Sequence, residues 1–296
     1  MTPTKAYLFE RIRAVYPDAD LSQADVNEDG LVNVAVIAGG RVYRFARTTA
    51  DQPVLMLETA VINLVRRYVD VPVPAFENIA DDFVTYPFLP GEALMRHDLL
   101  TLPDATQDSI ARQIAGFITQ LHSVPVADAQ AIGLEAPDPA DNRARWLRLY
   151  NIVKEVLFPL MYRVTQDYVN THFTPVLDDP HWLDYEPVLI HNDLAQYHIL
   201  YDAPSASITG VLDFGVANLN DPAKDYGILI NEYGETFLRR LAAHDPRLPQ
   251  LIDRARFYAG CASLEWAAIG VRSGDPTWFT AHLDRARDTL PYGVKL

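Results

Sequence analysis

Two aspartates between residues 187 and 226 are the groups in this sequence best placed to do chemistry. Asp193 follows the apolar run PVLI, and Asp213 ends a second apolar run, ITGVLDF. Irregular polar segments between buried strands are where catalytic groups usually lie. If the two runs pair as a hairpin, both carboxylates lie at one edge of a sheet. Gly215 would then let the chain turn directly after Asp213.

Two nearby carboxylates with a third ligand suit a site for magnesium and a nucleotide. Mg²⁺ prefers oxygen ligands and usually takes one or two protein carboxylates beside the phosphates of its substrate. Phosphoryl transfer in such a site depends on positioning and charge neutralisation more than on covalent help from the protein. The segment therefore indicates chemistry on a magnesium-bound nucleoside triphosphate.

The same segment resembles the signature of the aminoglycoside phosphotransferase and protein-kinase-like superfamily. That signature has a catalytic-loop aspartate, a metal ligand five positions later, and an aspartate in a D-F-G-like element. The matching residues are Asp193 in HNDL, His198 in YHIL and Asp213 in LDFG. The following DPAKDY resembles the family's D-P-x-x-D element, at Asp221 and Asp225. Three elements at family spacing form a specific match.

The first ninety residues carry the rest of the resemblance. RVYRFAR is similar to the family's third strand, whose basic residue reaches the nucleotide phosphates, here Arg44. Glu58 matches the helix glutamate that pairs with it. FVTYPFLPGEAL resembles the interlobe hinge. The resemblance implies that backbone groups near Pro87 and Leu89 read the purine base, with Tyr86 behind it.

Three positions depart from the family pattern. The usual strand lysine is Arg44, whose guanidinium stays charged but has a different geometry. The usual catalytic-loop asparagine is His198, although imidazole is not a favoured ligand of Mg²⁺. The aminoglycoside 2″-phosphotransferase and macrolide phosphotransferase branches resemble this sequence at that position, so His198 is kept as a metal ligand. The phosphate loop is not a full GxGxxG, and Gly30 and Asn33 are its candidate contacts.

The resemblance implies one role for each candidate residue. Asp193 orients the acceptor hydroxyl and takes its proton. Asp213 and His198 hold Mg²⁺ on the phosphates of ATP or GTP, while Arg44 neutralises phosphate charge. Three further residues are expected to support the catalytic loop: His191, Asp221 and Asp225.

The acceptor is predicted to be cationic, and an aminoglycoside antibiotic is the expected substrate. NEYGETF resembles the aminoglycoside 2″-phosphotransferases, in which acidic side chains bind ammonium groups; Glu232 and Glu235 match these, and Trp278 matches a stacking aromatic. Solvated helix faces and core packing are the alternative interpretations. A macrolide 2′-phosphotransferase and a sugar or amino-alcohol kinase remain alternatives in the same class. Arg44 and His198 motivate another, a nucleotide-binding pseudokinase.

The surrounding sequence predicts elements able to position these residues. A helix is expected over 4–17, two strands joined by Gly39-Gly40 over 31–46, a helix over 53–69 and a strand at FVTYPFL. Helical periodicity then dominates, over 107–122, 141–173 and from about 222 onward, interrupted by the short strands of 187–213. The prediction is an α+β, protein-kinase-like bilobal fold, with a nucleotide-binding lobe at 1–90 and a catalytic lobe at 91–296.

Composition narrows the choice of partners. Lys and Arg number 25 against 39 Asp and Glu, for a net charge of −14 in 296 residues. Nucleic acid is excluded as a partner because phosphate binding needs clustered basic residues. The single cysteine, Cys261, excludes an intramolecular disulfide and is expected to be buried. No apolar run approaches the ~20 residues that span a bilayer. We expect a cytoplasmic monomer that binds a nucleoside triphosphate and a small-molecule acceptor.

Overall fold

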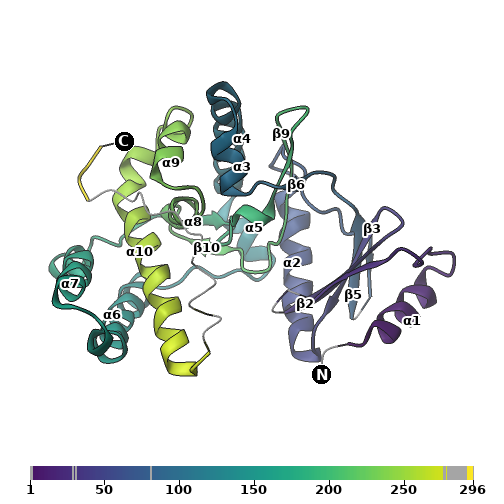
Figure 1. The fold of residues 1–296 in the computed structure, drawn as a ribbon, viewed down its shortest axis with the longest axis horizontal. Helices are drawn as coiled ribbons and strands as arrows, with labels where there is room; N and C mark the ends of the chain where they lie inside the picture. The colour runs from purple at the N-terminus through teal and green to yellow at the C-terminus, as the bar shows by residue number, and fades with distance from the viewer. Residues whose placement is uncertain are drawn as a thin grey trace.

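The computed structural model describes residues 3–28, 30, 32–80, 82–275, 278 and 292–295. An antiparallel sheet near the N-terminus is followed by a mainly helical remainder (Figure 1), so the α+β prediction is confirmed. The sheet has the order β1-β2-β3-β5-β4 and consists of β1 (Asp25–Asn27), β2 (Asn33–Ala38), β3 (Arg41–Ala46), β4 (Asn78–Ile79) and β5 (Phe83–Pro87).

The described helices lie on both sides of this sheet and beyond it. They are α1 (Lys5–Val15), α2 (Gln52–Val65), α3 (Arg96–Thr101), α4 (Asp104–His122), α5 (Val126–Ala131), α6 (Pro139–Val156), α7 (Arg163–Asp178), α8 (Ala223–Tyr233), α9 (Glu235–Ala242) and α10 (Leu248–Ser273). No helix in these ranges is long and apolar enough to cross a membrane.

The side chains of β3 alternate between the two faces of the sheet, and Arg44 lies on the face that packs against α2. Tyr43 and Phe45 belong to a small cluster with α1, whereas Val42 and Ala46 belong to the main core with α2. Side chains alternate along a strand, so Arg44 shares the α2 side with Val42 and Ala46. In Figure 1 α2 stands between the sheet and the helical part, so Arg44 faces the region where the two meet.

The turn between β2 and β3 is the one that the glycine pair predicts. Gly39 and Gly40 both have positive φ, 56° and 72°. Two consecutive residues of this kind form the tight turn whose twist matches that of a hairpin. The prediction of a hairpin over 31–46 is confirmed.

The helical stretch predicted over 141–173 is two helices rather than one. α6 ends at Val156, the short 3-10 helix η2 (Phe158–Leu160) follows, and α7 begins at Arg163. Pro159 explains the break, since it has no N–H to continue the ladder of α6 and its ring clashes with the preceding turn.

The strands around the two aspartates pair differently from the expected hairpin. β7 (Val188–Ile190), which precedes Asp193, pairs with β10 (Asn218–Asn220). The run before Asp213, β9 (Ser207–Val211), pairs with β8 (Ile199–Asp202), which also takes β6 (Glu92–Ala93). The hairpin prediction is wrong because β9 has a nearer partner. A short turn joins β9 to β8, whereas residues 191–206 separate it from β7.

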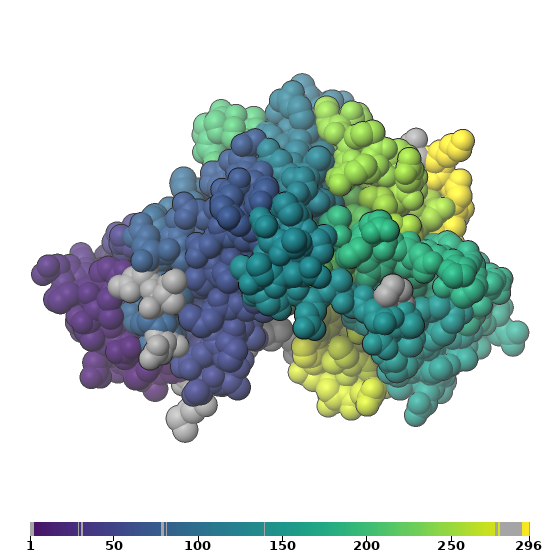
Figure 2. Space-filling model, turned by 180° about the vertical axis from the view of Figure 1, so that it is seen from behind, coloured from purple at the N-terminus to yellow at the C-terminus, as the bar shows by residue number. Residues whose placement is uncertain are grey.

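The crossing from the N-terminal sheet to the helical part is short. β5 ends at Pro87, and β6 already pairs with β8 of the second part. The predicted boundary at residue 90 falls in this crossing and stays a prediction. From behind, purple atoms occupy one end of the molecule, and teal, green and yellow atoms occupy most of the other (Figure 2). Cys261 is buried in α10 as expected, and burial raises the pKa of its thiol.

Candidate active site

Arg44 is the centre of a buried charged cluster where the sheet meets the second part. Its Nη1 donates to Glu58 Oε1 at 2.5 Å, and its Nη2 lies 3.1 Å from Asp213 Oδ1. Burial acts to lower the pKa of Arg44, but the carboxylates of Glu58 and Asp213 outweigh it and the pKa is raised. The structure thus brings together a strand cation, its helix partner and the aspartate of the LDFG element.

The loop before β2 lies against this cation. With its amide oriented so that the oxygen faces the guanidinium, Asn33 accepts from Arg44 Nε at 3.1 Å and from Nη2 at 2.7 Å. Gly30 approaches Asn33 so closely that an added Cβ would lie 2.8 Å from the carbonyl oxygen of Asn33. Only glycine allows that approach. Both predicted loop residues therefore lie near Arg44.

Asp213 is held in an unusual backbone conformation. Its φ is +62°, a region that a non-glycine residue rarely adopts and that is typical of functional sites. The turn is thus made at Asp213 itself, and Gly215 contributes a different feature: its N–H donates to Asp213 Oδ1 at 3.2 Å. Burial raises the pKa of the Asp213 carboxyl, but Arg44 and His198 more than offset this and the pKa is lowered. Asp213 is ionised at neutral pH.

His198 lies between the two aspartates. Its Nδ1–H donates to the backbone carbonyl of Asp193 at 2.9 Å and lies 3.6 Å from Asp193 Oδ2. Its Nε2 is 3.7 Å from Asp213 Oδ2. The hydrogen bond from Nδ1 leaves Nε2 unprotonated in the neutral ring, so its lone pair is available on the side of Asp213.

The donor set fits a magnesium ion held mainly by substrate. No group of three or more His, Cys, Asp or Glu side chains in the described part of the chain is arranged around a metal position. Asp213 supplies an ionised carboxylate and His198 one nitrogen. Mg²⁺ usually takes few protein ligands and completes its shell with phosphate oxygens and water. Two protein donors are therefore sufficient, although the nitrogen is an unusual one.

Asp193 stands at the end of a constrained loop, with 41% of its side chain exposed. Its own N–H donates to His191 Nδ1 at 3.2 Å, and His191 Nε2–H donates to the Leu212 carbonyl at 3.0 Å. Burial lowers the pKa of His191 to about 4, so the ring is neutral. Asn192 has φ +64°. His191 thus links the backbone before Asp213 to the backbone of Asp193.

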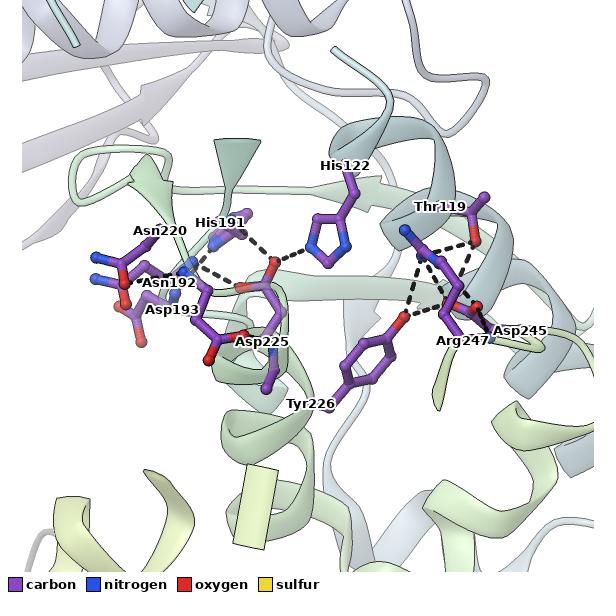
Figure 3. A network of polar contacts seen from close by, with 12 residues as sticks. Thr119, His122, His191, Asn192, Asp193, Asn220, Asp225, Tyr226, Asp245 and Arg247 are labelled. Carbon is purple, nitrogen blue, oxygen red and sulfur yellow. Dashed lines mark hydrogen bonds and ion pairs between the residues drawn. The ribbon is translucent and has the colours of Figure 1, made fainter. Parts of the chain in front are cut away.

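Asp225 binds this loop from below, as Figure 3 shows. Its Oδ1 accepts from the N–H of Asn192 at 2.8 Å, and its Oδ2 accepts from the N–H of His191 at 3.1 Å. The carboxylate is fully buried. Two amide hydrogen bonds directly before Asp193 fix the backbone from which the Asp193 side chain projects. The geometry agrees with the expected supporting role of Asp225.

His122 is a member of this network that the sequence interpretation missed. It ends α4, and its Nε2–H donates to Asp225 Oδ2 at 3.0 Å, with both side chains fully buried. The signal that could have identified it is the turn LHSVP at 121–125, which places a histidine at the end of an apolar helix. Next to it, the Tyr226 hydroxyl donates to Asp245, and Arg247 donates to the same carboxylate at 2.7 Å (Figure 3).

Asp221 supports the fold around the loop rather than the loop itself. It accepts from Arg254 Nε at 2.7 Å, from the Tyr258 hydroxyl at 2.8 Å and from the N–H of Ala223 at 2.9 Å. The first two donors come from α10 and the third from the start of α8. Asp221 therefore ties α8 to α10.

The three residues predicted to bind the acceptor lie in three different settings. Glu232 is fully buried, and its Oε2 accepts from the N–H of Gln196 at 3.3 Å. Glu235 is also buried, and both its oxygens accept from Arg256. Trp278 is half-buried and stacks on Trp266 with ring centroids 4.8 Å apart. Arg256 thus engages both oxygens of Glu235, whereas the loop backbone engages Oε2 of Glu232. Their burial favours a structural role for both glutamates.

The predicted hinge residues border the space between the two parts. Tyr86 is buried, packs against Phe76 at 5.3 Å between ring centroids, and has its pKa raised to about 12 by burial. Pro87 is exposed at the end of β5. Leu89 lies against Gly210, where an added Cβ would be 3.0 Å from Leu89 Cδ1. The absence of a side chain at Gly210 thus allows Leu89 to pack closely against β9.

Comparisons with known proteins agree with this geometry. The model of the phosphotransferase enzyme family matches residues 26–259. The GDP and kanamycin complex of the aminoglycoside phosphotransferase APH(2″)-IIIa is 27% identical, with a TM-score of 0.82 over 95% of this chain and 97% of that chain. Macrolide 2'-phosphotransferase type I shares the fold. It is 23% identical, with a TM-score of 0.73 over 95% of this chain and 97% of that chain.

One curated relative aligns with most of the chain. Viomycin phosphotransferase from Streptomyces vinaceus is 26% identical over an alignment of 262 positions, which covers 83% of this chain and 87% of that protein. The protein-kinase-like fold that the motifs predicted is confirmed by these comparisons.

Proposed function

The chain belongs to the phosphotransferase enzyme family, and we propose that it transfers the γ-phosphoryl group of ATP or GTP to a hydroxyl of a cationic antibiotic of the aminoglycoside type. The observation that carries the proposal is the arrangement of Asp193, His198 and Asp213 beside the Arg44–Glu58 pair. One edge of the site offers a solvent-accessible carboxylate, and the other offers a cation and metal donors.

Asp193 is the group that handles the acceptor. Its accessible carboxylate can accept a hydrogen bond from the hydroxyl, which orients the oxygen toward the γ-phosphorus. The new P–O bond forms as the bond to the bridging oxygen breaks and the nucleoside diphosphate leaves. The hydroxyl proton passes to Asp193 late in the reaction, because phosphoryl transfer has a loose transition state.

Asp213, His198 and Arg44 handle the phosphates. Asp213 and His198 would hold Mg²⁺, which neutralises charge on the phosphate oxygens when it is bound. The raised pKa of Arg44 keeps it cationic, so its guanidinium can exchange part of its contact with Asp213 for a phosphate. Glu58 keeps the guanidinium in place and also accepts from the N–H of Phe214 at 3.1 Å, next to Asp213.

Different observations support the proposed nucleotide and the proposed acceptor. The relative with bound GDP supports guanine nucleotides, and Tyr86 lies behind the base position that the hinge implies. Three observations support a cationic acceptor: the relative with bound kanamycin, the viomycin phosphotransferase, and a net charge of −14, which attracts cations. A cytoplasmic, monomeric enzyme completes the proposal, since triphosphates are available there.

An acceptor screen tests the proposal. The protein is incubated with Mg²⁺ and ATP or GTP and, in parallel, with kanamycin-type aminoglycosides, viomycin, macrolides and amino alcohols, and products are identified by mass spectrometry. Phosphorylated aminoglycosides as the preferred products support it. Phosphorylation of macrolides alone would reject the cationic acceptor while keeping the chemistry. Neither transfer nor nucleotide hydrolysis, in folded protein that binds nucleotide, would support the pseudokinase alternative.

A further inference from the structure

α8 presents two buried carboxylates on one face. Asp225 and Glu232 are seven residues apart, which is close to two turns of an α-helix and places them about 10 Å apart along the same side. Both side chains are buried, and both accept hydrogen bonds from backbone N–H groups of the loop that carries Asp193. The sequence interpretation gave them different roles, a brace and an acceptor ligand.

The two carboxylates bind the loop on opposite sides of Asp193. Asp225 accepts from the N–H groups of His191 and Asn192, directly before it. Glu232 accepts from the N–H of Gln196, three residues after it. Leu194 and Ala195, between Asp193 and Gln196, are buried. The backbone of the catalytic loop is therefore attached to one rigid helix before and after the residue that projects toward the acceptor.

The Glu232 side also connects to the segment that follows the hinge. Gln196 Oε1 accepts from the N–H of Arg96 at 2.7 Å, and the Tyr233 hydroxyl donates to the Leu94 carbonyl at 2.8 Å. Leu94 N–H in turn donates to the Ile199 carbonyl, at the end of the catalytic loop, at 2.8 Å. The end of α8, the catalytic loop and residues 94–96 thus form one connected unit.

We infer that Glu232 is a positioning residue, which acts on phosphoryl transfer by holding the Gln196 side of the catalytic loop and does not bind the acceptor. A fully buried carboxylate has no surface to offer to an ammonium group. A displacement of about 1 Å at a catalytic group can lower a rate about 100-fold, so a loop attached on one side only would be slow. The inference rests on the phosphotransferase activity and not on the identity of the acceptor.

Two substitutions of Gln196 isolate the hydrogen bond. Gln196→Pro removes the N–H that Glu232 accepts, and its site tolerates proline: Gln196 is the first residue of the short helix η3 (Gln196–His198), and Ala195 before it is extended, with φ −72° and ψ 153°. Gln196→Ala keeps the N–H and removes the side chain. The difference between the two variants therefore reports the contact with Glu232.

The first readout is nucleotide hydrolysis with water as the acceptor, followed by transfer to the best acceptor found. We expect Gln196→Pro to lower kcat about 10- to 100-fold relative to Gln196→Ala, and Glu232→Leu to lower it by a similar factor relative to wild type, with the nucleotide KM within about twofold. Glu232→Gln, whose amide oxygen still accepts, should recover most of the rate. Unchanged kcat with a raised acceptor KM in Glu232→Gln would overturn the inference in favour of acceptor binding.

The second readout does not need activity. In hydrogen exchange on the intact protein, peptides covering 191–198 should exchange at least about tenfold faster in Glu232→Leu and Gln196→Pro than in Gln196→Ala, while peptides of α10 stay unchanged. Equal exchange of 191–198 in all variants would overturn the inference, even for a protein without measurable transfer. If wild type neither hydrolyses nucleotide nor transfers phosphate, the proposed function fails, and the exchange result still decides the role of Glu232.

Discussion

Two sets of carboxylates lie within this site and differ in their exposure. The side chains of Asp193 and Asp213 are 41% and 34% exposed and face the space between the two parts. The carboxylates of Asp221, Asp225, Glu232 and Glu235 are all buried and accept from backbone amides, arginines, a histidine or a tyrosine. The chemical group is a carboxylate in both sets, but one set is accessible to solvent and the other is buried.

The free-energy cost of desolvation explains why accessible and buried carboxylates have different roles. A buried carboxylate is stable only when protein donors or cations compensate for its lost hydration, and burial keeps it out of reach of a ligand in solution. An accessible carboxylate keeps lone pairs that a hydroxyl proton or a metal ion can use. Exposure therefore distinguishes the carboxylates that we propose to act on substrate and metal from those that bind other parts of the protein.

The strongest test of this contrast replaces one member of each set. Asp193→Asn should lower kcat about 10²- to 10⁴-fold, because the acceptor proton loses its base, while the thermal midpoint stays near that of wild type. Asp225→Asn should lower both kcat and the thermal midpoint, because an amide cannot accept all three hydrogen bonds. Steady-state kinetics and calorimetry on the two variants measure this. A large loss of stability in Asp193→Asn would contradict the division.

The buried ion pair of Glu235 and Arg256 should dominate stability. Arg256→Met leaves the carboxylate of Glu235 buried without its cation and should cost about 3–5 kcal/mol of unfolding free energy. The double change Glu235→Gln and Arg256→Met should recover much of that loss. The matched control is Arg145→Met, which removes an exposed bridge to Glu265 and should cost at most about 1 kcal/mol. Urea unfolding distinguishes the pairs, and equal costs would refute the role of burial.

Buried histidines should make the protein sensitive to acid. Burial lowers the pKa of His172 from 6.5 to about 4, and its ring accepts from the Tyr292 hydroxyl at 2.8 Å. The unfolded chain binds the proton first, so this contribution is complete above pH 6.5 and is lost as the pH falls to 4. The loss is about 3 kcal/mol for this histidine. Unfolding free energies of wild type and His172→Gln, measured between pH 7 and 4, should differ in slope; parallel curves would exclude the effect.

Substitution of His198 by asparagine should have the smallest effect on activity. His198→Asn replaces a nitrogen ligand by the amide oxygen that Mg²⁺ prefers, so activity at saturating Mg²⁺ should stay within about tenfold of wild type. His198→Leu, which supplies no ligand, is the control and should raise the Mg²⁺ concentration needed for half-maximal rate. Titration of the rate with Mg²⁺ measures both. If the asparagine variant behaves like the leucine variant, His198 does more than hold the metal.

The sequence by itself determined the local features of this protein. The spacing of Asp193, His198 and Asp213, the apolar periods of α1, α2 and α4 and the Gly39-Gly40 turn are properties of neighbouring residues, and the fold class and family could be predicted from them. Local signals sufficed because a turn, a helix face or a loop motif is specified within a few residues.

Only the tertiary structure decided which acids are buried and which strands pair. Glu232 and Glu235 look like a solvated helix face in sequence, and the donors that bury them, Gln196 N–H and Arg256, are far along the chain. His122 hydrogen-bonds to Asp225, 103 residues later in the chain. β7 pairs with β10 and not with the run that ends at Asp213. The physical reason is that desolvation and pairing depend on packing between distant segments, and no local pattern encodes it.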